Sequence, residues 1–124
     1  MDRREIAAGA YIFREGDPAG ELYMLITGAV EVSLAGQAVA RITEGGSIFG
    51  EMSLLLGSPR TATVRTIAPS ELLVIHDLNV LVDTQPALLV RIATQLATRL
   101  KDMDERFVQL RRALEPPAQA GQPR

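Results

Sequence analysis

The sequence contains no cysteine and no tryptophan, and it has one histidine in 124 residues. Without cysteine, disulfide bridges and thiolate metal sites are excluded. A single histidine speaks against metal centres and catalytic groups that need several imidazoles, so we expect a structural or solvent-facing role for His76. The net charge of −2 gives no general attraction to nucleic acid, and no nucleic-acid partner is expected.

Long apolar runs are also missing. No stretch approaches the length of a membrane span, and residues 1–5 lack the apolar segment that a signal peptide needs. We therefore expect a cytoplasmic protein of bacterial type without membrane contact. Hydrophobic residues make up 47% of the chain, which is ordinary for a globular protein, and the length suits one domain with a real core.

Residues 10–76 show a series of short strand patterns separated by glycine-containing turns. Apolar and polar residues alternate over 29–34 and 37–43, and Ala35-Gly36 between them fits the tip of a hairpin. Further strands are predicted at 11–13, 21–27, 47–49, 61–66 and 70–75. This spacing predicts a small β-barrel or jelly roll over residues 10–76, with residues 1–9 as a lead-in.

After His76 the pattern becomes helical. Asp77 is suited to cap a short helix over 77–84, and Pro86 suits the first turn of a long helix. Residues 87–114 contain no glycine or proline. The sequence therefore predicts a mainly β protein with helices over 77–114 and a disordered tail, rich in Pro, Gln and Gly, over 115–124.

The long helix carries a heptad repeat. Its apolar residues follow four-three spacing at Leu89, Ala93, Leu96, Leu100, Met103, Phe107, Leu110 and Leu114. In the first half, Leu88 and Ile92 widen the apolar stripe, which fits packing on the chain's own core. In the second half the apolar stripe is narrow and flanked by charged residues, so the surface that covers it should be an equally narrow apolar stripe on another helix. We expect a homodimer through helix 86–114 in preference to a monomer.

The most informative segment is residues 49–64, FGEMSLLLGSPRTATV. Gly50 has no Cβ and lets the backbone approach a ligand closely. If a short helical turn follows, the N–H groups of residues 51–53 face an anion, which Arg60 can clamp from the other side. Glu51 would repel that anion but can accept a hydrogen bond from a sugar hydroxyl. The segment therefore predicts a site for one phosphate and one ribose hydroxyl, side by side.

Residues 49–64 resemble the phosphate-binding cassette of cyclic nucleotide-binding domains, F-G-E-[LM]-[AS]-L-L-x-x-x-P-R-x-A-[ST]-V, at every fixed place. The resemblance extends from Tyr11 to about Leu110, through Glu15-Gly16-Asp17-Pro18 and the run L-Y-x-[IL]-x-x-G-x-V-x-V at residues 22–32. It implies a ligand, cAMP or cGMP, that contacts Phe49, Gly50, Glu51, Met52, Ser53, Arg60, Thr61 and Ala62. Thr61 lies where members of the family that accept cGMP often carry a hydroxyl, but cAMP is the commoner bacterial messenger and is slightly favoured.

In the resembled family the helix after the barrel lies over the base, which makes Arg99, Asp102, Met103 and Asp104 the candidates for base contact. Two common features of the family are missing. The helices before the barrel are reduced to at most residues 2–8, and no helix-turn-helix follows the long helix, so direct gene regulation is not expected. The resemblance implies a non-enzymatic signalling module without cofactor or metal, which acts on an unknown protein effector.

Three alternatives stay open. The chain can be a structural dimer whose cassette has lost its ligand, or a regulatory fragment of a larger channel or transcription factor. The third alternative is a small-molecule enzyme on a cupin-like barrel, which the single histidine disfavours.

Overall fold

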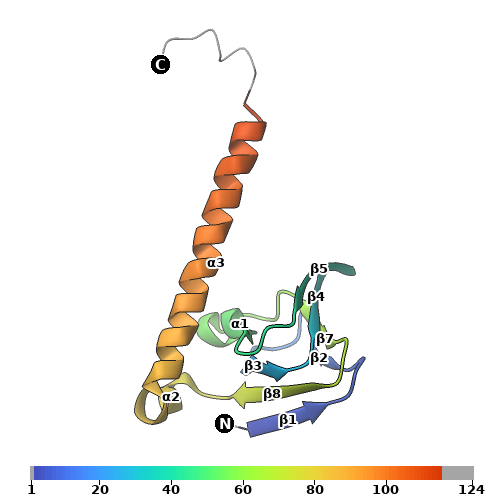
Figure 1. The fold of residues 1–124 in the computed structure, drawn as a ribbon, viewed down its shortest axis with the longest axis vertical. Helices are drawn as coiled ribbons and strands as arrows, with labels where there is room; N and C mark the ends of the chain where they lie inside the picture. Colours follow the sequence, from blue (N-terminus) through green and yellow to red (C-terminus); the bar gives the residue numbers. More distant parts are fainter. Residues whose placement is uncertain (1, 116–124) are drawn as a thin grey trace. The chain divides into compact units, whose positions relative to one another are not determined.

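The computed structural model describes residues 2–115, and the chain divides between Thr84 and Gln85 into two units (Figure 1). The first unit holds two four-stranded antiparallel sheets. One sheet has the order β1 (Asp2–Ile6), β8 (Ser70–Ile75), β3 (Leu22–Thr27), β6 (Ile48–Phe49). The other has the order β2 (Tyr11–Phe13), β7 (Thr63–Thr66), β4 (Val30–Leu34), β5 (Gln37–Ile42). The helices are α1 (Glu51–Leu56), α2 (Leu78–Thr84) and α3 (Pro86–Ala113). This jelly-roll-like sandwich with C-terminal helices confirms the predicted fold class.

Strand β1 corrects the expectation for residues 1–9, which were predicted to be a lead-in with at most a helix over Asp2–Ala8. It pairs with β8 along its whole length, from Asp2 opposite Val74 to Ile6 opposite Ser70. Residues 2–5 of β1 are exposed, so the strand has no strong apolar alternation of its own. The open edge of β8 supplies the hydrogen bonds, because strand formation depends more on a partner than on local propensity.

Two local predictions, a hairpin turn and a helix cap, are confirmed. Ala35 and Gly36, between β4 and β5, have φ angles of 50° and 82°, which is the geometry of a type I′ hairpin turn. The Asp77 carboxylate accepts a hydrogen bond of 2.8 Å from the Asn79 N–H and so caps α2. The predicted tail lies, from residue 116 onward, outside the described residues.

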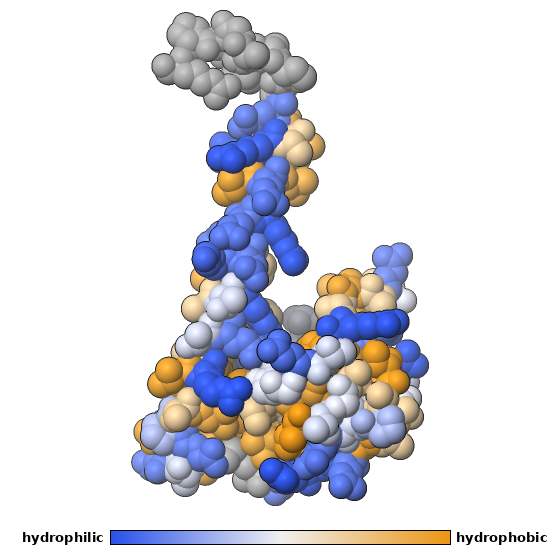
Figure 2. All heavy atoms as spheres, in the orientation of Figure 1, coloured by the Kyte–Doolittle hydropathy of each residue, from blue (hydrophilic) through white to orange (hydrophobic). Residues whose placement is uncertain are grey.

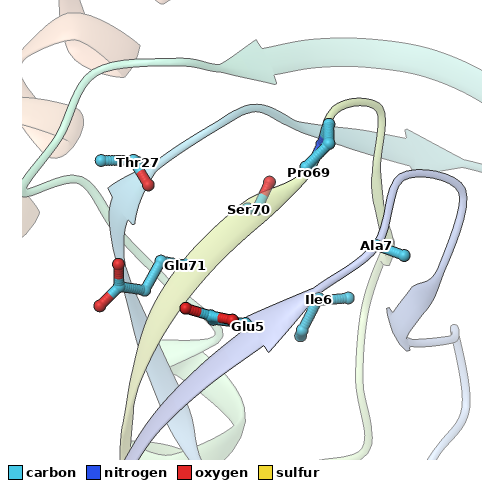
Figure 3. Close-up of a pocket in the computed structure, with 7 residues that line it drawn as sticks. All are labelled: Glu5, Ile6, Ala7, Thr27, Pro69, Ser70 and Glu71. Carbon is cyan, nitrogen blue, oxygen red and sulfur yellow. The ribbon is translucent and has the colours of Figure 1, made fainter.

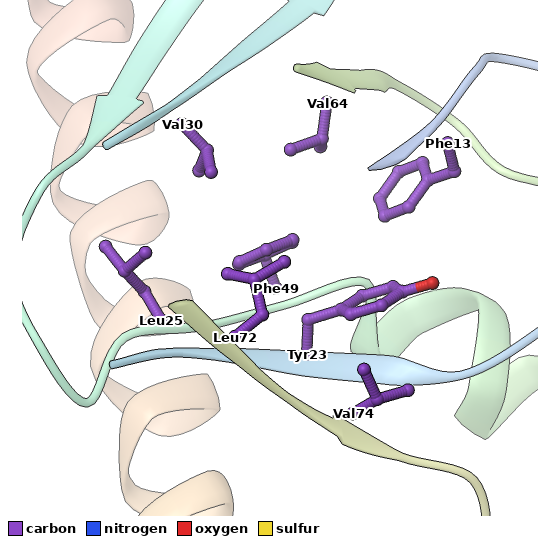
Figure 4. Close-up of a cluster of buried hydrophobic side chains, with 8 residues drawn as sticks. All are labelled: Phe13, Tyr23, Leu25, Val30, Phe49, Val64, Leu72 and Val74. Carbon is purple, nitrogen blue, oxygen red and sulfur yellow. The ribbon is translucent and has the colours of Figure 1, made fainter. Parts of the chain in front are cut away.

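The core of the first unit lies between the two sheets (Figure 4). It consists of Phe13, Tyr23, Leu25, Val30, Phe49, Val64, Leu72 and Val74, which come from six strands of both sheets. Three of its rings pack together, with centroids 5.4 Å apart for Tyr23 and Phe49 and 6.0 Å apart for Phe13 and Tyr23. Two of these rings lie on strands that lead into the site. Phe49 lies on β6, which leads into α1, and Phe13 lies on β2, which leads into the loop before β3.

The second unit contains α3, a helix of 28 residues. Apolar side chains of its C-terminal half are exposed, and Figure 2 shows them as orange spheres between hydrophilic blue ones. They include the heptad residues Leu100 (61%), Met103 (65%), Phe107 (65%), Leu110 (59%) and Leu114 (75%). Among the described residues, no helix has the length and apolar character that a membrane span requires.

Candidate functional site

The predicted cassette forms the short helix α1 and its flanking turns. Gly50, directly before α1, adopts a left-handed conformation with φ 80° and ψ 9°. Gly57, directly after α1, has φ 64°, and its N–H donates to the Ser53 carbonyl. A Cβ on Gly50 would lie 2.9 Å from Arg60 Nη1 and 3.3 Å from Phe13 Cε2. Glycine at position 50 is therefore required by the backbone angle and by the neighbouring side chains.

Arg60 is buried, with 5% of its surface exposed. Its Nη1 donates to the Gly50 carbonyl (2.9 Å), and its Nη2 donates to the Glu21 carbonyl (2.7 Å). The Arg60 Cζ atom lies 4.1 Å from the centre of the Phe13 ring. Both hydrogen-bond acceptors are neutral, so these two bonds do not cancel the charge of the guanidinium. Because a buried charge is costly without a counter-charge, this environment favours an anion beside Arg60.

The loop between β2 and β3 holds the Arg60 backbone. The Gly16 N–H donates to the Arg60 carbonyl (2.8 Å), and the Arg60 N–H donates to the Asp17 carbonyl (2.9 Å). The Asp17 carboxylate accepts a 2.9 Å bond from the Arg14 N–H and closes the loop's own turn. Residues Glu15-Gly16-Asp17-Pro18 were predicted only as part of the family resemblance. Their support of Arg60 was missed, because turn-forming residues do not reveal what the turn contacts.

The predicted side chains of the cassette divide into buried and exposed groups. Glu51 and Ser53 are each 4% exposed, and together with Arg60 they are buried polar residues. The Ser53 hydroxyl donates to the Ser58 carbonyl at 2.7 Å, so it contributes to the fold. The remaining cassette residues are Phe49 in the core cluster, Met52 and Thr61 at the surface, and Ala62 at an intermediate depth.

The predicted base-contacting residues belong to α3. Arg99 is half-buried, and Met103, Asp102 and Asp104 are exposed. These residues lie in the second unit, and the cassette lies in the first. Their contact with a base therefore stays a prediction.

A polar group beside the cassette contains the one histidine. The His76 Nε2 atom lies 3.0 Å from Asp2 Oδ2, and its Nδ1 atom lies 3.4 Å from Glu21 Oε1. The Tyr23 hydroxyl donates to Glu21 Oε2 at 3.0 Å. The ring of His76 thus bridges β1 and the start of β3, as a structural role predicts.

Three pKa values in this polar group are shifted. The hydrogen bond with His76 lowers the pKa of Asp2, and a backbone hydrogen bond is the largest cause that lowers the pKa of Glu21. Burial raises the pKa of Tyr23 to about 12, helped by the neighbouring Glu21 carboxylate.

Two of the open hollows on the first unit lie beside β1 and beside the cassette. One, of about 370 Å³, is lined by Glu5, Ile6, Ala7, Thr27, Pro69, Ser70 and Glu71, and Figure 3 shows its carboxylates on β1 and β8. It contains none of the predicted site residues. The other, of about 330 Å³, borders the cassette and is lined by Ala19, Gly20, Glu21, Ser53, Leu54, Gly57 and His76. Within residues 2–115, no group of three or more His, Cys, Asp or Glu side chains is arranged to hold a metal ion.

Comparison with known proteins agrees with the geometry of the cassette. Residues 3–81 match the family described as the cyclic nucleotide-binding domain. The chain belongs to this family. A putative potassium channel protein of Rhodopseudomonas palustris is 35% identical over 92 residues, which cover 71% of this chain and 22% of the channel protein. The chain thus spans less than a quarter of that relative's length.

Solved structures show the same domain. The catabolite activator protein of Thermus thermophilus superposes with a TM-score of 0.75 at 33% sequence identity, over 88% of this chain and 54% of that one. A cyclic nucleotide-binding domain from Methylobacillus flagellatus superposes with a TM-score of 0.72 at 27% identity, over 86% of this chain and 66% of that one. The resemblance that the cassette suggested is therefore confirmed at the level of the family and the fold.

Proposed function

We propose that the chain binds a cyclic mononucleotide, with cAMP favoured over cGMP, and that it is a ligand-responsive regulatory module without catalytic activity. The observation that carries the proposal is the buried guanidinium of Arg60. Its hydrogen bonds go to two neutral carbonyl oxygens, and the buried Glu51 belongs to the same cassette. A cyclic phosphodiester carries a single negative charge, which matches one such cation, and its ribose hydroxyl matches one carboxylate.

In the proposed complex the phosphate pairs with Arg60 and accepts hydrogen bonds from the N–H groups between Gly50 and Ser53. The ribose hydroxyl donates to Glu51. Thr61 and the α3 residues Arg99 and Met103 contact the base. The order of these contacts follows the family's cassette pattern at residues 49–64.

We further propose that α3 forms a homodimer and that the nucleotide shifts α3 between two positions, which a protein effector senses. The exposed heptad residues of α3 support the dimer, since a narrow apolar stripe flanked by charges is best covered by a second copy of itself.

A second candidate is a regulatory domain within a larger protein. The match to a channel protein of which this chain spans 22% supports that candidate.

Calorimetric titration of nucleotide-stripped protein with cAMP and with cGMP tests the function. We expect binding to be at least tenfold weaker in Arg60→Ala, because a charge-assisted hydrogen bond contributes about 1.5–3 kcal/mol. Arg65→Ala is the matched control, because Arg65 lies on β7 and its Nη2 atom is 3.4 Å from Glu31. Equal affinity of Arg60→Ala and the wild type would contradict the site. Thermal unfolding of each variant shows whether the protein titrated is folded.

A further inference from the structure

The guanidinium of Arg60 is held on its edges and on one face. Two carbonyl oxygens take its Nη1 and Nη2 hydrogens, and the Phe13 ring lies 4.1 Å from its Cζ atom. The Tyr23 ring lies at 5.9 Å from the same atom. A cation over the face of an aromatic ring is attracted by the ring's quadrupole, most strongly where water is excluded. The rings therefore restrict the guanidinium in a direction that the carbonyls leave open.

The two rings are themselves fixed by the core. Phe13 and Tyr23 are 9% and 5% exposed, and Tyr23 packs on Phe49 with an angle of 17° between the ring planes (Figure 4). The Tyr23 hydroxyl also donates to the side chain of Glu21, whose carbonyl accepts from Arg60. Rings in a close-packed core resist displacement, so they offer Arg60 a rigid surface.

The space at the edges of the guanidinium is equally restricted. A Cβ on Gly20 would lie 3.1 Å from Nη2, and a Cβ on Gly50 would lie 2.9 Å from Nη1. A side chain at either position would crowd the head group, so glycine at both positions leaves it the space that it occupies. Together with the ring face, this surrounds Arg60 with fixed neighbours before any ligand arrives.

We propose that Phe13 and Tyr23 are positioning residues, which hold the Arg60 guanidinium in its binding position in the free protein and so raise nucleotide affinity through Arg60. The inference rests on the proposed function, since it concerns the residues that order Arg60, the proposed phosphate-binding side chain. An arginine side chain that is ordered in advance loses little further freedom on binding. Removing the Phe13 ring should therefore weaken the affinity even though Phe13 lies in the core.

Two substitutions at Phe13 and one elsewhere in the core separate positioning from stability. Phe13→Leu removes the ring, and Phe13→Tyr keeps it. Val30→Ala removes buried volume at the end of the same cluster away from Phe13 (Figure 4). We expect about tenfold weaker cAMP binding in Phe13→Leu, of the size of a desolvated cation–π contact, and near wild-type affinity in Phe13→Tyr and Val30→Ala.

A second readout needs no ligand. In the free wild-type protein, the ring current of Phe13 should shift the Arg60 side-chain N–H signals upfield in ¹H–¹⁵N spectra, assigned with Arg60→Lys. The shift should disappear in Phe13→Leu and persist in Val30→Ala.

The outcomes are distinct. Wild-type affinity in Phe13→Leu, or equal losses in Phe13→Leu and Val30→Ala, would overturn the positioning role. If the wild type binds neither cAMP nor cGMP, the proposed function fails, and the Arg60 signals then decide by themselves whether Phe13 holds the guanidinium. If Phe13→Leu does not fold, the ring-current shift of the Arg60 signals in the free wild-type protein decides: its presence supports the inference, and its absence refutes it.

Discussion

Gly50 and Gly57 flank the same helix in the same left-handed conformation, and they form a matched pair for testing the cassette. Gly50 has φ 80° and Gly57 has φ 64°. A Cβ on Gly57 meets no atom within 4 Å, whereas a Cβ on Gly50 meets Arg60 Nη1 at 2.9 Å. Substitution of each glycine by alanine therefore imposes similar backbone strain, but Gly50→Ala alone of the two also disturbs Arg60.

The magnitude follows from these contacts. An alanine in a left-handed conformation costs roughly 1–2 kcal/mol, which is all that we expect for Gly57→Ala. In Gly50→Ala, Nη1 must withdraw from the Gly50 carbonyl, and the loss of that charge-assisted bond adds about 1.5–3 kcal/mol. Phe13 Cε2, 3.3 Å from the added Cβ, limits the relaxation on the ring side. Gly50→Ala should thus lose about 2.5–5 kcal/mol of unfolding free energy in total.

Urea unfolding measures the stability of both variants, with equal m values required for the comparison. Calorimetric titration then measures cAMP binding at a temperature where both are folded. We expect at least tenfold weaker binding in Gly50→Ala and wild-type affinity in Gly57→Ala. Equal destabilisation of the two variants would refute the reasoning, because it would mean that Arg60 moves aside at no cost.

Two further predictions concern ionisation and assembly. Tyr23 should titrate near pH 12 in absorbance measurements on a Tyr11→Phe background. Since its folded pKa lies above the ordinary value of 10.0, the unfolded chain loses its proton first. Stability should therefore fall by about 2 kcal/mol as the pH rises from 10 to 12, and it should fall less in Tyr23→Phe. Phe107→Asp, at a heptad position of α3, should convert a dimer to a monomer in sedimentation velocity, whereas Val108→Asp, one residue outside the stripe, should leave it intact.

The sequence predicted the strands and helices whose signals are local. Alternation located β4 and β5, and the change of period located α3 to within a residue at either end. Strand β1 was missed because its partner, β8, is about seventy residues away, and its own residues show no clear alternation. The strand conformation of β1 arises from tertiary pairing, which the local sequence pattern does not show.

The site shows the same division. The cassette residues and the expected role of Arg60 came from one continuous segment, which spacing and resemblance can identify. Part of the support of Arg60 comes from outside that segment. Of its two carbonyl partners, Gly50 lies within the cassette and Glu21 lies 39 positions away, and the carbonyl of any residue type can accept such a bond. Backbone acceptors leave no mark on amino-acid identity, so composition and spacing cannot reveal them.

The position of Arg60 couples ligand binding to the stability of the first unit. The guanidinium joins the Gly50 carbonyl before α1 to the Glu21 carbonyl before β3. In the proposed complex the phosphate either displaces one of these carbonyls from its N–H donor or accepts from the donors that the carbonyls leave free. A guanidinium has five N–H donors, of which these two bonds use two, so a ligand can be bound without breaking them. If the carbonyl bonds persist in the complex, nucleotide should raise the unfolding temperature of the wild type while the chemical environments of Gly50 and Glu21 change little. If the phosphate instead replaces a carbonyl, the loop before β3 must be released, and its amide exchange should accelerate on binding.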